Sequence, residues 1–385
     1  MPEAAKSTLR MVLGIAVCAL VTLLFLEVES QWIVAALGIV VVAALLVMEK
    51  TGMRARLEED TARHRTLALS LAVAAVLSVA GALHESHFAL LMLATVALYA
   101  TACLGLTIQF GYAGIANFAG AAFFGIGCYS AAILATRTAL PHLLVVFAGG
   151  AIAALIGSML ILPILRTRGH YAALITIAFG ILFRTFLEVN DTLGGPQGLK
   201  VPGLTILGWS FNDPVRIGKG IETSFYLNYV VLAVLLAVSA YVVVKRIERS
   251  WIGLSFDAVR LDETAAAVSG IDIARWKILA FVLGNFLAGM AGAVYAMMSG
   301  FIAPNNFTFG DSLILVSIVI LGGLGNPLGV IVAALLLLVL PEKLQVIQEY
   351  RFLLYALLVI AILLFRPQGL LPRRLREYSP RRVRE

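Results

Sequence analysis

Residues 251–277, WIGLSFDAVRLDETAAAVSGIDIARWK, form a polar stretch between two long apolar runs and carry seven charged side chains. Three successive alanines within it would leave the backbone of a helix nearly bare, so that the surface of another protein can approach closely. The flanking Arg260, Asp262 and Glu263 could orient such a partner through ion pairs at the rim. Alanine is also a good helix former, so plain connection of two spans remains an open alternative to docking.

Capping residues predict where this helix begins and ends. Ser255 or Asp257 could cap its start. Gly270 is placed to end it, because glycine takes the left-handed conformation at low cost. Asp272 could then cap a second short helix. If the docking interpretation holds, Ala266→Arg should prevent a partner from binding while the chain still folds and inserts.

The sequence does not contain the residue patterns that several other kinds of chemistry require. There is no G-x-x-x-x-G-K-[ST] loop for ATP, and neither H-E-x-x-H nor paired aspartates within apolar runs predict an enzyme or a metal site. The sequence predicts no cofactor. Arg184 and Glu188 are the main ionisable residues inside the apolar runs; they could pair, or Arg184 could anchor at the membrane interface. Acidic residues in mid-span are lacking, which disfavours ion coupling, so the energy for any transport must come from a partner.

The elements that position these residues are predicted from the composition. The chain is 61% hydrophobic and 13% charged, with a mean hydropathy of +0.97. Long apolar runs of this kind predict one all-α integral membrane protein, a polytopic helical bundle of about 10–12 membrane segments with broken or re-entrant helices. The first apolar run is interpreted as a retained helix rather than a signal peptide. The expected segments lie near 11–26, 32–48, 66–83, 88–108, 115–136, 143–165, 171–188, 225–244, 277–299, 311–322, 327–340 and 352–365.

Charge between the segments predicts the topology. If the segments alternate sides, one side receives 22 of the 29 Lys and Arg residues, which places both termini in the cytoplasm. The net charge of +7 therefore reflects topology in a lipid bilayer rather than nucleic-acid binding. We expect an N-terminal two-span extension with a cytoplasmic linker (1–65), a transmembrane domain (66–372) and a basic cytoplasmic tail (373–385). The main loops are 190–224 outside and 245–276 inside.

Two apolar segments are interrupted by glycine and asparagine, which is the best sequence indication of a transport pathway. At any one glycine, close packing of small residues against a neighbouring helix is the favoured alternative. The candidate pathway residues are Gly111, Asn117, Gly125 and Gly127 in the first segment, and Gly322, Gly323 and Asn326 in the second.

Seven motifs along the chain together resemble one family, the permeases of high-affinity branched-chain amino-acid ABC transporters, and specifically their larger, M-type partner. The resemblance covers roughly residues 85–372. Its motifs are GYAGIANFAGAAFFGIGCYSAAIL (111–134), LRTRGHYAALITIAFG (165–180), TLGGPQGL (192–199), GLSFDAVRLDETAAAVSGI (253–271), GNFLAGMAGAVYA (284–296), VILGGLGNPLG (319–329) and FRPQGLLP (365–372).

The resemblance implies a function and a set of partners. Ala265, Ala266 and Gly270 match the family's ATPase-coupling loop, although Thr264 stands where a glutamate is usual and Glu263 lies one residue earlier. Two ABC ATPase subunits, a second homologous permease subunit and a periplasmic solute-binding protein are the implied partners, in a bacterial inner membrane. The implied solute is leucine, isoleucine or valine. A related importer of urea, an amide or an aromatic acid, or an ion-coupled secondary carrier, remains an alternative.

Overall fold

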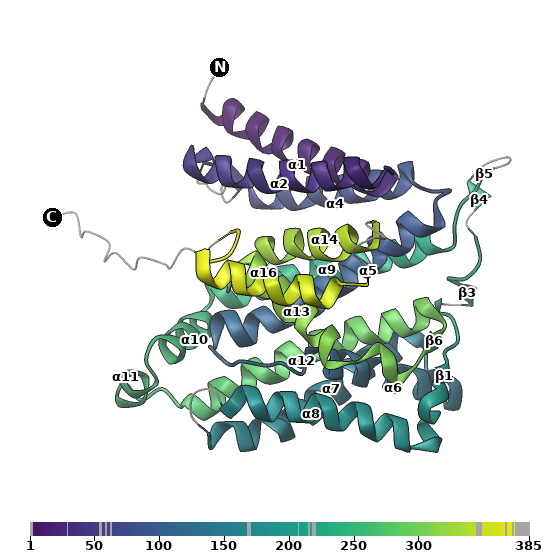
Figure 1. Cartoon of the computed structure of the whole chain (residues 1–385), viewed down its shortest axis with the longest axis vertical. Coiled ribbons are helices and arrows are strands. Elements are labelled where there is room, and N and C mark those ends of the chain that lie inside the picture. Colours follow the sequence, from purple (N-terminus) through teal and green to yellow (C-terminus); the bar gives the residue numbers. More distant parts are fainter. Residues whose placement is uncertain are drawn as a thin grey trace.

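The computed structural model of the chain is mainly helical, and its long helices run side by side (Figure 1). It describes residues 3–28, 30–53, 56–57, 60–61, 64–167, 171–206, 208–214, 216–217, 221–343, 349–365, 368–371 and 373. The predicted basic tail therefore lies outside the described residues, apart from Arg373.

Each of the twelve predicted apolar segments coincides with a helix of the described chain. Seven helical stretches there are long and apolar enough to cross a membrane, which confirms the prediction of a polytopic all-α membrane protein. The helices are α1 (Glu3–Glu27), α2 (Gln31–Lys50), α4 (Arg65–Ala82), α5 (His87–Leu106), α6 (Gly120–Arg137), α7 (His142–Leu165), α8 (Tyr171–Val189), α9 (Tyr226–Arg249), α12 (Ile273–Ser299), α13 (Phe309–Gly322), α14 (Pro327–Lys343) and α16 (Arg351–Phe365).

The centre of the bundle is built on α12, which packs against α5, α6 and α7. Small residues allow this packing, because lipid tails are as apolar as leucine and helices associate chiefly through close contact. A methyl group at Gly292 of α12, for example, would lie 2.0 Å from the carbonyl oxygen of Phe124 in α6. In contrast, α8 exposes most of its surface.

The helix break after α5 is longer than the sequence predicted. α5 continues into a π-helical turn, η1 (Thr107–Tyr112), and residues 113–119 are then non-helical before α6 begins at Gly120. The prediction of a helix from residue 115 was wrong, since Asn117 and Thr176 side chains bind the backbone N–H groups of Ala119 and Phe118 in place of helical carbonyls. Irregular backbone of this kind occurs at membrane depth only where protein encloses it or it lines a cavity.

A second break joins α13 to α14. The four residues from Gly323 to Asn326 form a tight turn, and the two helices pack against each other. Gly323 and Gly325 both have positive φ angles, +103° and +87°, which residues with a side chain rarely adopt. The two short predicted segments are therefore two separate helices.

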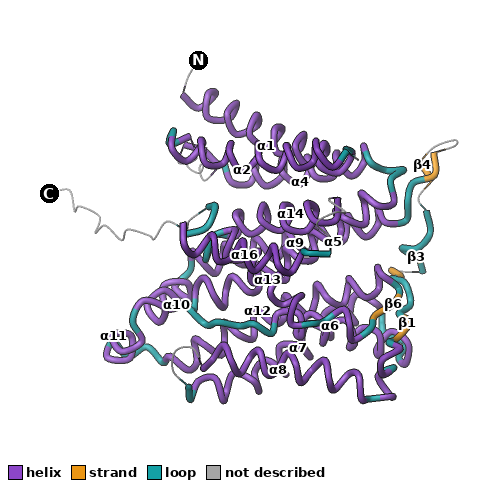
Figure 2. Tube along the Cα trace, in the orientation of Figure 1, coloured by secondary structure: helices purple, strands orange, loops and turns teal. Residues whose placement is uncertain are grey.

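The two ends of the bundle differ in structure (Figure 2). Two short helices, α10 (Trp251–Leu261) and α11 (Glu263–Val268), protrude at the end where α1 begins and α16 ends. Short strands and 3-10 turns occupy the opposite end; they are η2 (Asp191–Leu193), η3 (Gly195–Gln197), β1 (Leu199–Lys200), β2 (Thr205–Ile206), β3 (Trp209–Ser210), β4 (Arg216–Ile217), β5 (Ile221–Glu222), β6 (Phe301–Ile302) and η4 (Pro304–Asn306). β1 pairs antiparallel with β6, so the long loop 190–224 is joined to the end of α12.

At this strand-rich end, Arg184 and Glu188 form the predicted pair. The Arg184 Nε lies 2.8 Å from the Glu188 carboxylate, and its Nη2 donates a hydrogen bond to Asn305 in η4. The ion pair thus also connects α8 to the segment before α13.

The N-terminal helices α1, α2 and α4 form a layer on one side of the bundle (Figure 1). Within this layer Arg10 pairs with Asp60 at 2.9 Å. The ammonium of Lys343, at the end of α14, donates to the carbonyls of Leu26 and Val28 at 2.7 and 3.2 Å. The predicted domain boundary at residue 65 stays a prediction, and α4 lies beside α1 in the structure.

Candidate functional site

The polar stretch forms an elbow of two helices rather than the predicted single helix. Ser250 caps α10 by accepting from the Ile252 N–H, and Asp262 interrupts the helix and caps α11 through the Thr264 and Ala265 N–H groups. The caps proposed at Ser255 and Asp257 were therefore wrong, because the helix begins one turn earlier. We call α10 and α11 together the elbow.

The far side of the elbow follows the prediction more closely. Gly270 follows α11 with a φ of +80°, the left-handed conformation expected there. Asp272 accepts from the Arg275 N–H and caps a helix, but that helix is the long α12 rather than a short one. The elbow is thus joined through four residues, 269–272, to the helix at the centre of the bundle.

The outer surface of the elbow is apolar and exposed. Val268 is 86% exposed and Leu261 is 70% exposed, whereas Ala266 is only 4% exposed. Ala265 lies on the exposed side, but Ala266 faces the chain itself. Ala266→Arg would therefore disturb the folding of α11 as well as any docking, and Val268 is the better position for a test.

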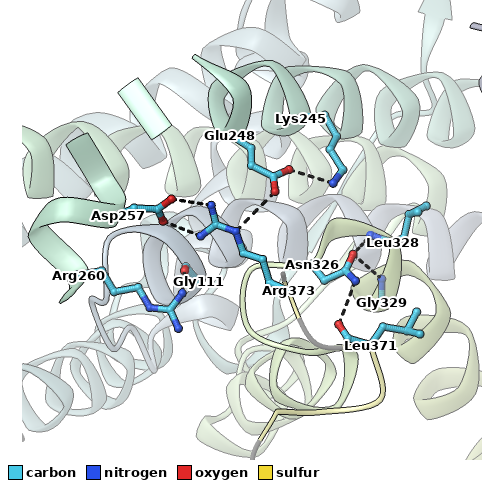
Figure 3. Close-up of polar contacts among 10 residues, drawn as sticks. All are labelled: Gly111, Lys245, Glu248, Asp257, Arg260, Asn326, Leu328, Gly329, Leu371 and Arg373. Atoms are coloured by element: carbon cyan, nitrogen blue, oxygen red, sulfur yellow. Dashed lines mark hydrogen bonds and ion pairs between the residues drawn. The ribbon is translucent and has the colours of Figure 1, made fainter. Parts of the chain in front are cut away.

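Arg260 is an exposed residue of α10, and its Nη1 donates a hydrogen bond to the carbonyl of Gly111 in η1 (Figure 3). Its role in orienting a partner at the rim of this surface stays a prediction. Burial lowers the pKa of the Arg260 guanidinium from its ordinary value, and the positive charge of Arg373 adds to this effect. The predicted docking residue is thus bound to a predicted pathway residue.

Glu263 is half exposed on α11 and pairs with Lys277 at the start of α12, with 2.6 Å between the Glu263 Oε1 and the Lys277 Nζ. This ion pair bridges the turn at Gly270. It fixes the angle between α11 and α12 without closing the exposed apolar surface.

The two helix breaks touch each other directly beneath the elbow. A methyl group at Gly111 would lie 2.4 Å from the backbone nitrogen of Gly325. Asn326 donates from its Nδ2 to the Leu371 carbonyl at 2.9 Å, and its Oδ1 accepts from the Leu328 and Gly329 N–H groups (Figure 3). Gly111 and Asn326 were predicted from separate motifs, and the structure brings them into one cluster.

Sequence reasoning missed the residue that joins these parts, Arg373. Its guanidinium forms two hydrogen bonds with the Asp257 carboxylate, at 2.6 and 2.9 Å, and lies 4.5 Å above the Tyr112 ring centroid. Burial acts to lower the pKa of Arg373, but the hydrogen bonds and charge of Asp257 raise it above its ordinary value. Arg373 was counted only as a topology charge, because nothing local indicates a partner 116 residues away.

The other candidate glycines lie at close helix contacts. A methyl group at Gly127 would lie 2.0 Å from the Gly289 carbonyl oxygen, and one at Gly125 would lie 2.9 Å from the rings of Phe183 and Phe307. Gly322 is similarly close to Gly329, and Gly323 to the Leu371 carbonyl oxygen. These contacts favour the packing interpretation at each position, and a role in a pathway stays a prediction.

Asn117 belongs to a buried cluster of three amide side chains at the first break. Its Nδ2 donates to the Gln109 Oε1 at 2.7 Å, and the Gln109 Nε2 donates to the Asn285 Oδ1 at 3.0 Å. The Asn285 Nδ2 is buried and has no hydrogen-bond partner among the described residues. Gln109 was also missed, although a glutamine at the end of an apolar run is a detectable signal. Asn285 lies on α12, so these amide hydrogen bonds connect the first break to the central helix.

Together these contacts join the exposed surface of the elbow to both helix breaks and to the central helix. An exposed apolar elbow is bonded through Arg260 to one helix break, through Asp257 and Arg373 to the second, and through Gly270 to the central helix. Among the described residues, no group of three or more His, Cys, Asp or Glu side chains could hold a metal ion.

Comparison with known proteins agrees with this architecture. The family described as the permease component of the branched-chain amino acid transport system matches residues 88–364, and the chain therefore belongs to this family. No solved structure matches the chain.

Three relatives show the range of similar proteins. The chain is 35% identical over 282 residues to the high-affinity branched-chain amino acid transport system permease protein LivM of Escherichia coli, covering 70% of this chain and 66% of that protein. It is 25% identical over 289 residues to LivH of Salmonella typhimurium, covering 71% of this chain and 91% of that protein. It is 34% identical over 134 residues to the autoinducer 2 import system permease protein LsrC of Klebsiella pneumoniae, covering 33% and 36%.

Proposed function

We propose that this chain is the permease subunit of an ATP-binding-cassette importer that moves branched-chain amino acids across a bacterial inner membrane. ATP would be hydrolysed on two partner subunits that dock on the elbow. A second, homologous permease and a periplasmic binding protein would complete the transporter. Both termini would lie in the cytoplasm, on the same side as the elbow.

The observation that carries the proposal is the elbow itself. Val268 and Leu261 are large apolar side chains left exposed at an end of the bundle where loops and charges, rather than lipid, are expected. Fully burying such a side chain contributes about 1.5–3 kcal/mol. A partner that covers the elbow would therefore gain affinity, and the contacts of Arg260 and Arg373 would carry its movement to the helix breaks.

Family membership supports the choice of solute and of partners. LivM and LivH are both named as permeases of high-affinity branched-chain amino acid transport, and this chain is similar to both. The similarity to two different permeases supports a paired, heteromeric arrangement. Loop 190–224, at the end opposite the elbow, is the surface we assign to the binding protein.

The test is a substitution that opposes docking without disturbing the bundle. Val268→Asp places a charge on the exposed surface of α11, and we expect binding of the ATPase subunits to weaken roughly 10- to 100-fold, which corresponds to the loss of one buried side chain. Affinity is measured by titrating purified ATPase subunits onto the permease in nanodiscs. Leu140→Asp is the matched control, because Leu140 is a 43% exposed apolar residue between α6 and α7, outside the elbow.

Uptake of radiolabelled leucine by proteoliposomes that hold the whole transporter then tests the activity. Uptake should require ATP and the binding protein, and Val268→Asp should lower it while Leu140→Asp leaves it unchanged. Equal ATPase affinity for the Val268→Asp and original chains would refute docking on the elbow. Uptake by this chain alone, driven by an ion gradient without nucleotide, would establish a secondary carrier instead.

A second candidate solute class follows from LsrC, whose name gives autoinducer 2 as the imported compound. The fold therefore does not dictate an amino acid. Competition of labelled leucine uptake by valine, isoleucine, autoinducer 2, urea, amides and aromatic acids separates the proposed solute from the alternatives.

A further inference from the structure

We propose that Arg373 is a positioning residue that fastens α10 to both helix breaks, so that movement of the elbow reaches the two breaks together. The proposal rests on the proposed function, because it concerns how the movement of a docked partner would be transmitted. Figure 3 shows Arg373 together with Asp257, Glu248, Asn326 and Leu371.

The contact between Arg373 and α10 is enclosed and geometrically defined. The Nη1 lies 2.6 Å from the Asp257 Oδ1 and the Nη2 lies 2.9 Å from the Oδ2, so the two planar groups meet through two parallel hydrogen bonds. Side-chain exposure is only 7% for Arg373 and 15% for Asp257. Such a two-point pair fixes orientation as well as distance, which a single ammonium contact does not.

The same guanidinium contacts the first helix break. It lies over the Tyr112 ring, the last residue of η1, with 4.5 Å from Cζ to the ring centroid. Its Nε lies 3.5 Å from the carboxylate of Glu248 at the end of α9, which itself pairs with Lys245 at 2.9 Å. Arg373 thus touches α9, α10 and η1 at one point.

The backbone that carries Arg373 is attached to the second break. The Leu370 N–H donates to the Leu321 carbonyl at 2.7 Å, and the Asn326 side chain donates to the Leu371 carbonyl at 2.9 Å. A methyl group at Gly325 would lie 2.7 Å from the Arg373 Cδ, so that glycine leaves room for the arginine stem. Of the residues after α16, the described ones, 368–371 and 373, therefore connect the α13–α14 turn to α10, and we call them the strut.

Stability alone does not account for this arrangement. A buried ion pair is weak evidence for stabilisation, because desolvating both charges offsets their attraction and apolar replacements of similar volume are often neutral. What the pair adds is a fixed geometry between elements far apart in sequence. A strut of this kind should be replaceable without unfolding the chain, but not without loss of coupling.

The experiment uses the whole transporter in proteoliposomes, with three forms of the chain. The double variant Asp257→Leu/Arg373→Met removes both charges, the swap Asp257→Arg/Arg373→Asp restores a pair of opposite polarity, and Arg184→Met removes a surface arginine paired with Glu188 at the other end. The readouts are leucine taken up per ATP hydrolysed and amide hydrogen exchange of residues 251–261 in the same complex. Complex yield reports assembly.

We expect the double variant to assemble and hydrolyse ATP, with uptake per ATP at least about tenfold lower, a typical size for coupling between sites. Exchange in 251–261 should rise, and the swap should recover about half of the loss, because the pair is re-formed in a slightly different geometry. Arg184→Met should change neither readout. A double variant with normal uptake per ATP overturns the proposal, and so does low uptake with unchanged exchange.

The remaining outcomes are also decisive. If the double variant fails to assemble, the swap variant is used in its place. Recovery of leucine uptake per ATP in the swap variant supports the proposal, whereas an assembled swap variant whose uptake per ATP stays tenfold low overturns it. If the original complex shows no ATP-driven uptake, the proposed function fails by itself. Hydrogen exchange then tests the role of Arg373 separately, since unchanged exchange in residues 251–261 would show that Arg373 does not hold α10 in place.

Discussion

The contact between α6 and α12 at Gly127 offers a sharp test of the packing at the centre of the bundle. A methyl group there would lie 2.0 Å from the carbonyl oxygen of Gly289 and 2.6 Å from its carbonyl carbon and Cα. These atoms belong to backbone, so no side-chain rotation can relieve the overlap. Gly127→Ala must therefore push the two helices apart.

The size of the effect can be worked from these distances. Non-bonded carbon and oxygen atoms approach to a little over 3 Å, so α6 and α12 must separate by about 1 Å, which weakens dispersion contacts along the interface. Overpacking of this kind costs about 1–3 kcal/mol. We expect the cost to lie at the upper end of this range, because the added methyl group meets backbone atoms, which cannot move aside as a side chain can. Alanine recovers slightly under 1 kcal/mol of helix propensity. The net expectation is a loss of about 2 kcal/mol in the free energy of unfolding.

Gly180→Ala is the matched control. Gly180 lies within α8, and among the described residues nothing lies within 4 Å of the position that its methyl group would take. Only the helix-propensity gain remains, so this variant should be more stable than the original chain by about 0.5–1 kcal/mol. The same substitution is thus expected to lower the free energy of unfolding at Gly127 and to raise it at Gly180.

The assay is unfolding of the purified permease in mixed micelles by titration with a denaturing detergent, followed by tryptophan fluorescence. Because both variants differ from the original chain by one methyl group, the difference between them isolates the α6–α12 contact. A Gly127→Ala protein as stable as Gly180→Ala would refute the backbone approach of the two helices.

Two further substitutions test the first break and the N-terminal layer. Asn117→Leu leaves the Ala119 N–H and the Gln109 Oε1 without their hydrogen-bond partner, and each buried group without a partner costs about 1–3 kcal/mol. Thr176→Val leaves only the Phe118 N–H without a partner. The same unfolding assay should therefore show a clearly larger loss of stability for Asn117→Leu than for Thr176→Val. Equal losses would contradict the amide cluster. Lys343→Met removes the ammonium that holds the carbonyls of Leu26 and Val28, so hydrogen exchange around residues 24–34 should rise while leucine uptake is kept; unchanged exchange would show that this anchor is not needed.

The existence of the helices could be predicted from the sequence because lipid imposes a simple rule on apolar runs. Each run must satisfy its own backbone, so its presence alone predicts a helix. The long α12, predicted over 277–299, begins only four residues earlier, at Ile273. Its start is set by the Asp272 cap, which lies outside the apolar run and which hydropathy does not detect.

The first helix break was predicted from its glycines but not in its extent. Residues 113–119 are mostly apolar, and by composition they extend the following helix. What keeps them out of it is hydrogen bonding of the backbone N–H groups of Ala119 and Phe118 to the side chains of Asn117, within the segment, and Thr176, on α8. Thr176 is far away in the sequence, so neither composition nor periodicity indicates this second contact.

The elbow illustrates the same limit for charged residues. Arg260 and Asp257 were interpreted as surface and capping residues, because both lie in an obviously polar stretch. Their partners are the Gly111 carbonyl and Arg373, which no local pattern connects to them. The residue types and their spacing identified the polar segment. The contacts of each side chain could be found only from the folded structure.

The contacts that satisfy the two helix breaks are also the contacts that join them to the elbow. Gly111 in the irregular turn accepts from Arg260, and the α13–α14 turn is held by Asn326 and by the segment carrying Arg373. Backbone groups freed by a break inside a membrane protein must find partners, and here several of these partners lie on or beside α10. A partner that moved α10 would therefore change the hydrogen bonding of both breaks at once.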